Sequence, residues 1–200
     1  METAISIALG IGLSAGCGFR VFVPLLIMSL AAHTGHLALA PGFDWVRTLP
    51  ALIAFGTATL VEVLAYYTPW LDHFLDTIAT PAAVVAGVIA SAAAFTDMSP
   101  LLRWTLALIG GGGIAGLVQG ATVLARLKST VLTGGLGSPI VSTAELVGSV
   151  ITPILAILAP VITVTVIAAG VYAVSRVTGR LLFGRQRADR WRSSGPNPPK

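Results

Sequence analysis

The sequence predicts an all-α membrane protein, a polytopic helical bundle of about six spans arranged as a 3+3 inverted repeat with broken or re-entrant segments. Hydrophobic residues make up 55% of the 200-residue chain and charged residues only 10%, whereas about a quarter of a soluble domain is charged. Apolar runs long enough to cross a bilayer recur along the whole chain, so no separate soluble domain is expected. One pattern of polar and apolar residues also occurs twice.

The repeated pattern places a carboxylate in an apolar run, follows it with Thr-Pro and a further Pro, and ends in Ala-Gly-Val. The first copy runs from Glu62 to Gly87 and the second from Glu145 to Gly170, and each spacing is 25 residues. The register slips by one residue at the Thr-Pro, so the alignment requires an indel. A chance match between apolar segments is the alternative explanation.

The positive charge belongs to the C-terminal tail. The net charge is +4, but seven of the twelve Lys and Arg residues lie from Arg176 onward, against the single Asp189. A basic segment that follows a membrane span indicates contact with a lipid surface, and we expect no nucleic-acid partner. We therefore expect one transmembrane domain over residues 1–183 and a disordered, basic cytoplasmic tail over residues 184–200.

The first apolar segment, residues 4–32, is longer than a hydrocarbon core of about 30 Å requires, so a single helix there must tilt strongly or break. The run Gly16-Cys17-Gly18, with Arg20 and Pro24 after it, marks the expected break. An arginine in lipid costs roughly 3 kcal/mol or more. Arg20 is therefore expected to face a carboxylate, backbone carbonyls or water inside the bundle.

The second span covers residues 50–67 and carries Glu62, with aromatic residues at its end as an interface belt. Thr68-Pro69 predicts the start of a short amphipathic helix with Asp76 on its polar face, which lies at the interface or forms one arm of a re-entrant element. Thr80-Pro81 predicts a new helix start and the beginning of the third span.

The fourth span is expected to begin at Ser99-Pro100 and to end at Arg126 and Lys128. The run Gly134-Gly135-Leu136-Gly137-Ser138-Pro139 then opens a fifth span that carries Glu145, and a sixth span runs from residue 160 to about 183. Glycines recur every four residues in two spans and predict faces of close helix packing, which also allow a homodimer. These glycines are Gly12 and Gly16 in the first span and Gly112, Gly116 and Gly120 in the fourth.

Three spans in each half place the halves, residues 3–97 and 99–183, in opposite orientations, as in many secondary transporters. Such an inversion requires the glycine run before the fifth span to lie within the membrane, where broken backbone is tolerated only beside protein or a water-filled cavity. A cavity near Glu145 is therefore expected. Basic residues favour the cytoplasm, so we expect the tail, Arg126 and Lys128 on the cytoplasmic side. With six spans, both termini are then expected there as well.

Ionisable residues within membrane spans are candidates for function. Two carboxylates, Glu62 and Glu145, can bind a cation or carry a proton, with Arg20 as a counter-charge. This predicts a transporter or channel for an ion or small solute. The alternatives are a lipid flippase or scramblase that holds a phosphate headgroup at Arg20, and a scaffold that transports nothing and uses Arg-Glu pairs to fix helix register. The predicted pathway residues are Arg20, Glu62, Asp76, Gly135, Gly137, Ser138 and Glu145.

An enzymatic function is not expected, because the few polar residues form no evident set of nucleophile and base. Cys17 is the only cysteine, which excludes an intrachain disulfide and a multi-cysteine metal site. His33 and His36 lack a third ligand nearby and are read as loop residues, so neither a metal nor another cofactor is expected. Residues 111–116 satisfy Gly-x-Gly-x-x-Gly but lack the preceding strand and the acidic residue of a dinucleotide site.

Four stretches of this sequence resemble a family of bacterial membrane proteins catalogued as domain of unknown function 4126. They are Gly16-Cys17-Gly18-Phe19-Arg20-Val21-Phe22-Val23-Pro24, the run from Glu62 to Pro69, Leu75-Asp76-Thr77-Ile78-Ala79-Thr80-Pro81 and Gly134-Gly135-Leu136-Gly137-Ser138-Pro139. The resemblance covers nearly all of residues 3–160. It implies a bacterial membrane protein and no activity, ligand or catalytic residue. For a multi-pass protein of this kind we expect the bacterial inner membrane as its location and membrane lipids as partners.

Overall fold

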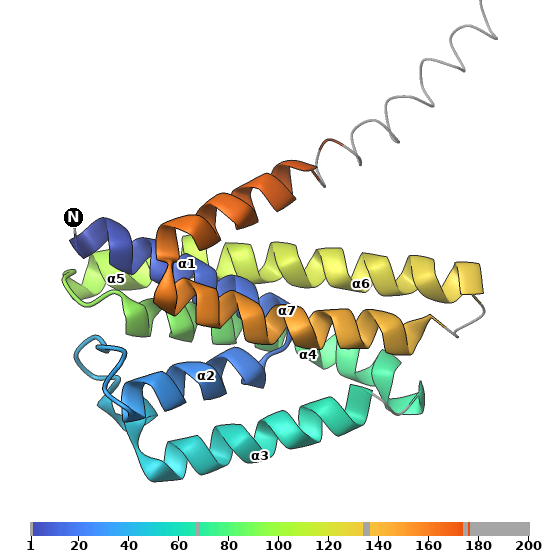
Figure 1. The fold of residues 1–200 in the computed structure, drawn as a ribbon, viewed down its shortest axis with the longest axis horizontal. Coiled ribbons are helices and arrows are strands. Elements are labelled where there is room, and N and C mark those ends of the chain that lie inside the picture. Colours follow the sequence, from blue (N-terminus) through green and yellow to red (C-terminus); the bar gives the residue numbers. More distant parts are fainter. Residues whose placement is uncertain (1, 67–68, 134–136, 174–175, 177–200) are drawn as a thin grey trace, which may run out of the picture. The chain divides into compact units, whose positions relative to one another are not determined.

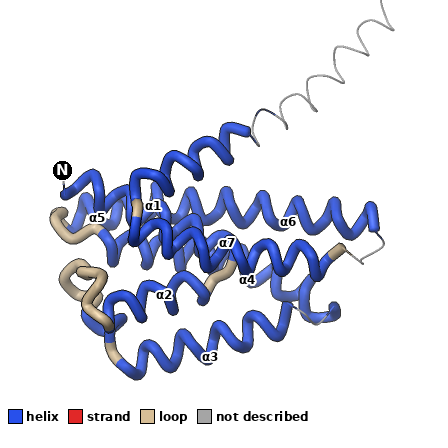
Figure 2. Tube along the Cα trace, viewed as in Figure 1, coloured by secondary structure: helices blue, strands red, loops and turns tan. Residues whose placement is uncertain are grey.

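The computed structural model describes residues 2–66, 69–133, 137–173 and 176, with their side chains except those of residues 69–76 and 138. Every regular element in this part of the chain is helical, which confirms the all-α bundle (Figures 1 and 2). The elements are α1 (Glu2–Phe19), α2 (Phe22–His33), η1 (Asp44–Arg47), α3 (Leu49–Tyr66), α4 (Pro69–Ala94), α5 (Pro100–Leu106), η2 (Ala107–Gly112), α6 (Gly113–Thr133) and α7 (Ser138–Leu158). A further apolar helix, Pro160–Ala173, follows α7.

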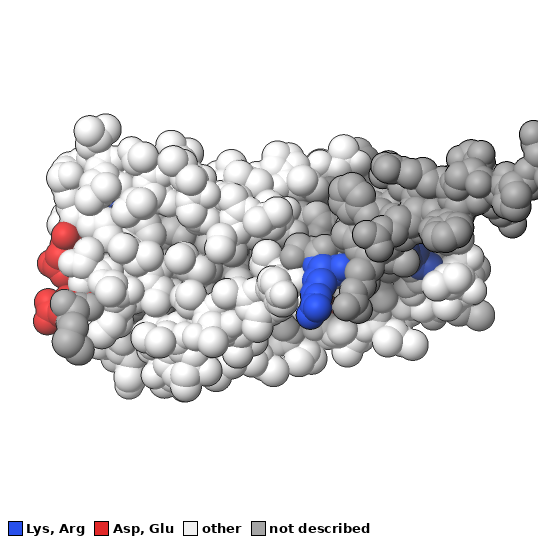
Figure 3. Space-filling model, turned by 90° about the horizontal axis from the view of Figure 1, so that it is seen from above, with Lys and Arg blue, Asp and Glu red and all other residues white. Residues whose placement is uncertain are grey.

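The bundle belongs to the first of two compact units, Met1–Val164, and the second unit is Thr165–Lys200. Among the described residues, five helical segments are long and apolar enough to cross a membrane, so the chain is a multi-pass membrane protein. Large apolar side chains cover the outside: Leu101 is 82% exposed and Ile109 is 73% exposed. In Figure 3, acidic side chains lie at one end, and the surface beside them is uncharged. The predicted tail, residues 184–200, lies outside the described residues.

Helices α1 and α2 form a hairpin whose two outer ends lie at the same end of the bundle (Figure 1). Near the start of α1, the carbonyl of Gly10 accepts a hydrogen bond from Ser91 Oγ at 2.9 Å. Beyond the end of α2, the N–H of Ala40 donates to the carbonyl of Ala93 at 2.8 Å. Both contacts lie in the last turns of α4. The predicted break is confirmed, but the first apolar segment turns back there and does not form one span.

The hairpin is tight because glycines let its neighbours approach α1 closely. A Cβ at Gly16 would lie 3.0 Å from Pro24 of α2 and 3.1 Å from Pro153 of α7. A Cβ at Gly18 would lie 2.6 Å from the carbonyl oxygen of Ala115 in α6. Helix α1 thus packs against α2, α4, α6 and α7, and the predicted close-packing face of the first span is confirmed.

The prediction of a separate short helix before the third span is wrong. Residues 69–94 form the single helix α4, with Pro81 inside it. A proline within a helix removes one backbone hydrogen bond and favours a kink, but it does not oblige the helix to end. On the facing segment, a Cβ at Gly112 or Gly116 would contact Val84 of α4, whereas one at Gly120 would meet nothing within 4 Å. The predicted glycine face of the fourth span therefore stops at Gly116.

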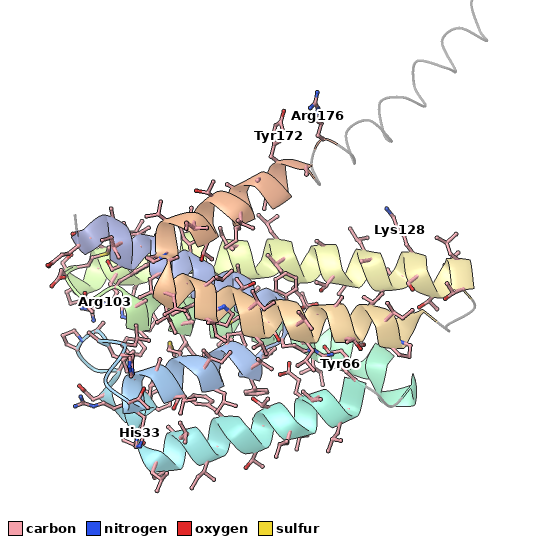
Figure 4. The ribbon with its side chains drawn as sticks, viewed as in Figure 1. His33, Tyr66, Arg103, Lys128, Tyr172 and Arg176 are labelled. Atoms are coloured by element: carbon pink, nitrogen blue, oxygen red, sulfur yellow. The ribbon has the colours of Figure 1, made fainter. Side chains whose placement is uncertain are left out.

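The described residues do not support the inverted repeat. The N-terminal half opens with the α1–α2 hairpin, which returns to its starting end, whereas α5, η2 and α6 continue in one direction to the opposite end (Figure 1). The hairpin also places the N-terminus and Lys128 at opposite ends of the bundle (Figures 1 and 4). The expectation that both lie at the cytoplasmic face therefore does not fit this arrangement.

Candidate functional site

The tip of the α1–α2 hairpin is held by Glu62, which extends from α3. One carboxylate oxygen accepts the N–H of Val21 at 2.7 Å, and the other accepts the N–H of Phe22 at 3.0 Å. The first N–H groups of a helix have no acceptor within the helix, and the helix dipole attracts a negative charge there. The Glu62 carboxylate, which is 7% exposed, therefore caps α2 from a different helix.

Arg20 lies at the turn of the hairpin and is only 1% exposed. Its Nη2 donates to the backbone carbonyl of Ser142 in α7 at 3.1 Å, and its Cζ lies 3.8 Å from the ring centroid of Tyr66. The prediction that Arg20 faces a carbonyl inside the bundle is confirmed. Glu62 and Glu145 are its electrostatic neighbours, but within the described residues neither forms an ion pair with it.

A second arginine, Arg126 of α6, pairs with Glu145 of α7. Arg126 Nε donates to one Glu145 oxygen at 3.0 Å, and Nη2 donates to the other. The two side chains are 6% and 4% exposed. The Arg126 guanidinium also lies 4.3 Å from the ring centroid of Tyr66. The prediction that Arg126 marks the membrane interface at the end of its span is wrong.

Four buried ionisable side chains thus gather around Tyr66. We name the five residues together the charge cluster: Arg20, Glu62, Tyr66, Arg126 and Glu145. Tyr66, one of the aromatic residues at the end of the second span that were predicted as an interface belt, is 5% exposed and contacts both arginines. The helical rise places Arg126 about 10 Å before the end of α6. Removing so many charges from water costs several kcal/mol per ion before their mutual attraction is counted.

A pocket of about 290 Å³ lies against the charge cluster, between the start of α2 and helices α3 and α4. Glu62 and Tyr66 belong to its wall, which is otherwise apolar. Val61 and Ile78 line it as well and are 61% and 51% exposed, so the pocket opens at the side of the bundle. Glu145 is not among the residues that line this pocket. The pocket is therefore not the cavity that we expected near Glu145.

The remaining predicted pathway residues are not brought to the charge cluster by the described structure. The side chain of Asp76 and all of Gly135 lie outside the described residues. The N–H of Gly137 donates to Thr133 Oγ1 at 2.8 Å and so bridges the end of α6 to the start of α7. Ser138 begins α7, and its side chain is not described. In the described part, no three His, Cys, Asp or Glu side chains lie close enough to hold a metal ion.

Sequence reasoning missed Arg126, Ser142 and Tyr66 as members of the site. For Arg126, the local sequence carried no signal of burial. For Ser142, the signal was its position three residues before Glu145 on the same face of a helix. For Tyr66, the signal was its position four residues after Glu62 on the same face of α3.

Comparison with known proteins supports the resemblance noted above. Neither the curated proteins nor the solved structures gave a match to this chain. The family described as Domain of unknown function (DUF4126) matches residues 7–180, and the chain therefore belongs to this family.

Proposed function

We propose that this protein is a small transporter or channel that moves an ion or small solute across a bacterial plasma membrane. The pathway passes the charge cluster, which includes Arg20, Glu62 and Glu145. The proposal includes no catalytic role, because the few polar residues of the sequence form no evident set of nucleophile and base.

One observation carries the proposal: the charge cluster is buried at the tip of a hairpin that stops inside the bundle. A bundle that only has to pack gains little from buried ions, since apolar residues of similar size are often as stable or more stable. Ionisable groups that persist inside membrane bundles usually line a pathway for ions or protons. The broken backbone at Arg20 also resembles the discontinuous helices that form substrate sites in transporters.

We also propose an orientation. Basic residues favour the cytoplasm, so the Lys128 end of the bundle faces it and the N-terminus lies on the other side. A span that starts at residue 160 returns the basic tail to the cytoplasm. Two arginines, Arg47 and Arg103, lie at the end that carries the N-terminus. They are compatible with this orientation because each has a partner within the protein. Arg47 pairs with Asp44 at 3.0 Å, and the buried Arg103 donates to the carbonyl of Pro41 at 3.1 Å.

The test is a flux assay with the purified protein in liposomes, using a panel of single-ion and small-solute gradients. Wild-type protein is expected to give a flux that Glu62→Gln abolishes, because the amide cannot carry the charge. The matched control is Asp97→Asn, the same change at an exposed carboxylate in a loop, and it should retain the flux. Equal flux from wild type and Glu62→Gln removes this carboxylate from the mechanism. If no solute gives a flux, lipid handling and a non-transporting scaffold remain as the alternatives.

A second candidate function, lipid flipping or scrambling, is favoured by the pocket. Its apolar wall opens between α3 and α4 at the exposed residues Val61 and Ile78, where acyl chains surround a membrane protein. A lipid-handling protein is expected to move fluorescent phospholipids between leaflets in liposomes, and Ala79→Leu in the pocket wall should block this by filling the space. Leaflet exchange that Ala79→Leu does not change rules out a role for the pocket.

A further inference from the structure

The hydrogen-bonding capacity of the charge cluster is unevenly used. Each Glu62 oxygen accepts one backbone N–H, and each Glu145 oxygen accepts one N–H of Arg126. Both carboxylates are therefore already supplied with donors by the protein itself. A cation that entered the cluster would have to displace these donors and would meet two arginines.

The donors of Arg20, in contrast, are only partly used. Its Nη2 donates to the Ser142 carbonyl, but its buried Nε and Nη1 have no hydrogen-bond partner within the described part of the chain. The hydroxyl of the same Ser142 is also buried without a partner there. A guanidinium cannot shed its proton, and each buried donor left without an acceptor destabilises the protein. A hydrogen-bond acceptor is therefore expected beside Arg20 and Ser142.

We propose that Arg20 and Ser142 form a binding site for an anionic group with several oxygens, a carboxylate or a phosphate. The N–H bonds of Arg20 Nε and Nη1 point away from each other, so one such group accepts from one of them and, through a second oxygen, from the Ser142 hydroxyl. A halide ion with its single atom does this less completely. The inference rests on the proposed transport function and names its substrate class: the moving species, or its recognised part, is an anion.

The pocket gives this site a route from outside. Val21 and Phe22, which follow Arg20 in the chain, line the pocket, and so does Tyr66, whose ring Arg20 contacts. Arg20 therefore contacts the pocket wall at Tyr66, and an anion that enters from the pocket must displace the Tyr66 side chain to reach it. The same route admits a soluble anion or the headgroup of a lipid whose chains occupy the pocket, so an experiment must separate these sources.

The experiment measures binding to the full chain purified in detergent. Sodium phosphate and sodium acetate are titrated against sodium chloride at matched ionic strength, and thermal unfolding is recorded. We expect a saturable rise in Tm that phosphate or acetate gives and chloride does not. Arg20→Lys retains the charge but loses donors, and it should raise the apparent Kd about tenfold or more. The control Arg47→Lys, at an arginine outside the charge cluster, should leave Kd unchanged.

Bound lipid phosphorus, measured on the same samples, identifies the source. If added anions have no effect but wild-type protein retains phospholipid that Arg20→Lys loses, the ligand is a headgroup and the anion site stands. If neither anions nor retained phospholipid distinguish the two proteins, water satisfies Arg20 and the inference is wrong. Should Arg20→Lys fail to fold, Ser142→Ala takes its place, with an expected severalfold rise in Kd.

The outcome is separable from that of the flux assay. Anion binding that depends on Arg20 without any flux overturns only the transport proposal. Flux that Glu62→Gln abolishes, with no anion binding and no retained headgroup, overturns only the anion site.

Discussion

The pair formed by Arg126 and Glu145 should be much more sensitive to loss of one partner than to replacement of both. Its side chains are 6% and 4% exposed and share two hydrogen bonds. Glu145→Leu leaves the Arg126 guanidinium buried beside Tyr66 without its carboxylate. Removing one partner of a buried ion pair costs about 3–5 kcal/mol, chiefly because the remaining charge stays out of water.

The double replacement Arg126→Met with Glu145→Leu removes both charges and keeps similar volumes. It should restore stability to within about 1 kcal/mol of wild type, which gives a coupling energy of at least about 2 kcal/mol in a double-mutant cycle. The assay is equilibrium unfolding of purified protein in mixed detergent micelles, followed by tryptophan fluorescence.

The matched control is the pair of Arg47 and Asp44, whose side chains are 60% and 67% exposed. Its single and double replacements, Arg47→Met and Asp44→Leu, should each change stability by less than about 1 kcal/mol, as exposed pairs do. If Glu145→Leu costs no more than Asp44→Leu, or if the double replacement is no better than the single one, the pair is hydrated and the buried charge cluster is refuted.

Three further predictions concern the bundle. Gly87→Ala should lower Tm, because the new Cβ would lie 2.5 Å from Ala115 Cβ. The new Cβ of Gly120→Ala meets nothing within 4 Å, so this change should raise stability by up to about 1 kcal/mol through helix propensity. Equal effects of the two substitutions on Tm contradict the close packing of α4. Cys17 is fully buried, so a maleimide should label it only in unfolded protein, and rapid labelling of native protein contradicts its position. In a Cys17→Ala background, Thr3→Cys and His36→Cys should react with an impermeant maleimide from the same side of the membrane; labelling from opposite sides means that the first segment crosses as one span.

Local sequence was sufficient to predict the break in the first apolar segment. Glycines before Arg20 and a proline after it disfavour a continuous helix, and α1 indeed ends at Phe19. Local sequence was misleading at Thr80-Pro81, where a proline was taken for a helix start. Packing along α4 keeps that helix continuous, because the loss of one backbone hydrogen bond is smaller than the stabilisation that a packed helix provides.

The members of the charge cluster were only partly predictable. Glu62, Glu145 and Arg20 stood out because each is an ionisable residue within a long apolar run. Arg126 did not, because an arginine near the end of a span usually extends to the headgroups. Its burial depends on the length of α6 beyond it, which continues to Thr133. A predicted span end at Arg126 and Lys128, in place of Thr133, was enough to put Arg126 on the wrong side of the interface.

The sequence by itself determined the class of this protein, because a chain with so few charges and such long apolar runs is suited to a helical bundle in a membrane. It also determined which charges must be satisfied inside. Only the tertiary structure decided how, because their partners lie far along the chain: 41 residues separate Glu62 from Val21, and 122 separate Arg20 from Ser142. Local preference carries no information about such contacts, so the return of the hairpin and the donors left over at Arg20 became visible only once the helices were packed.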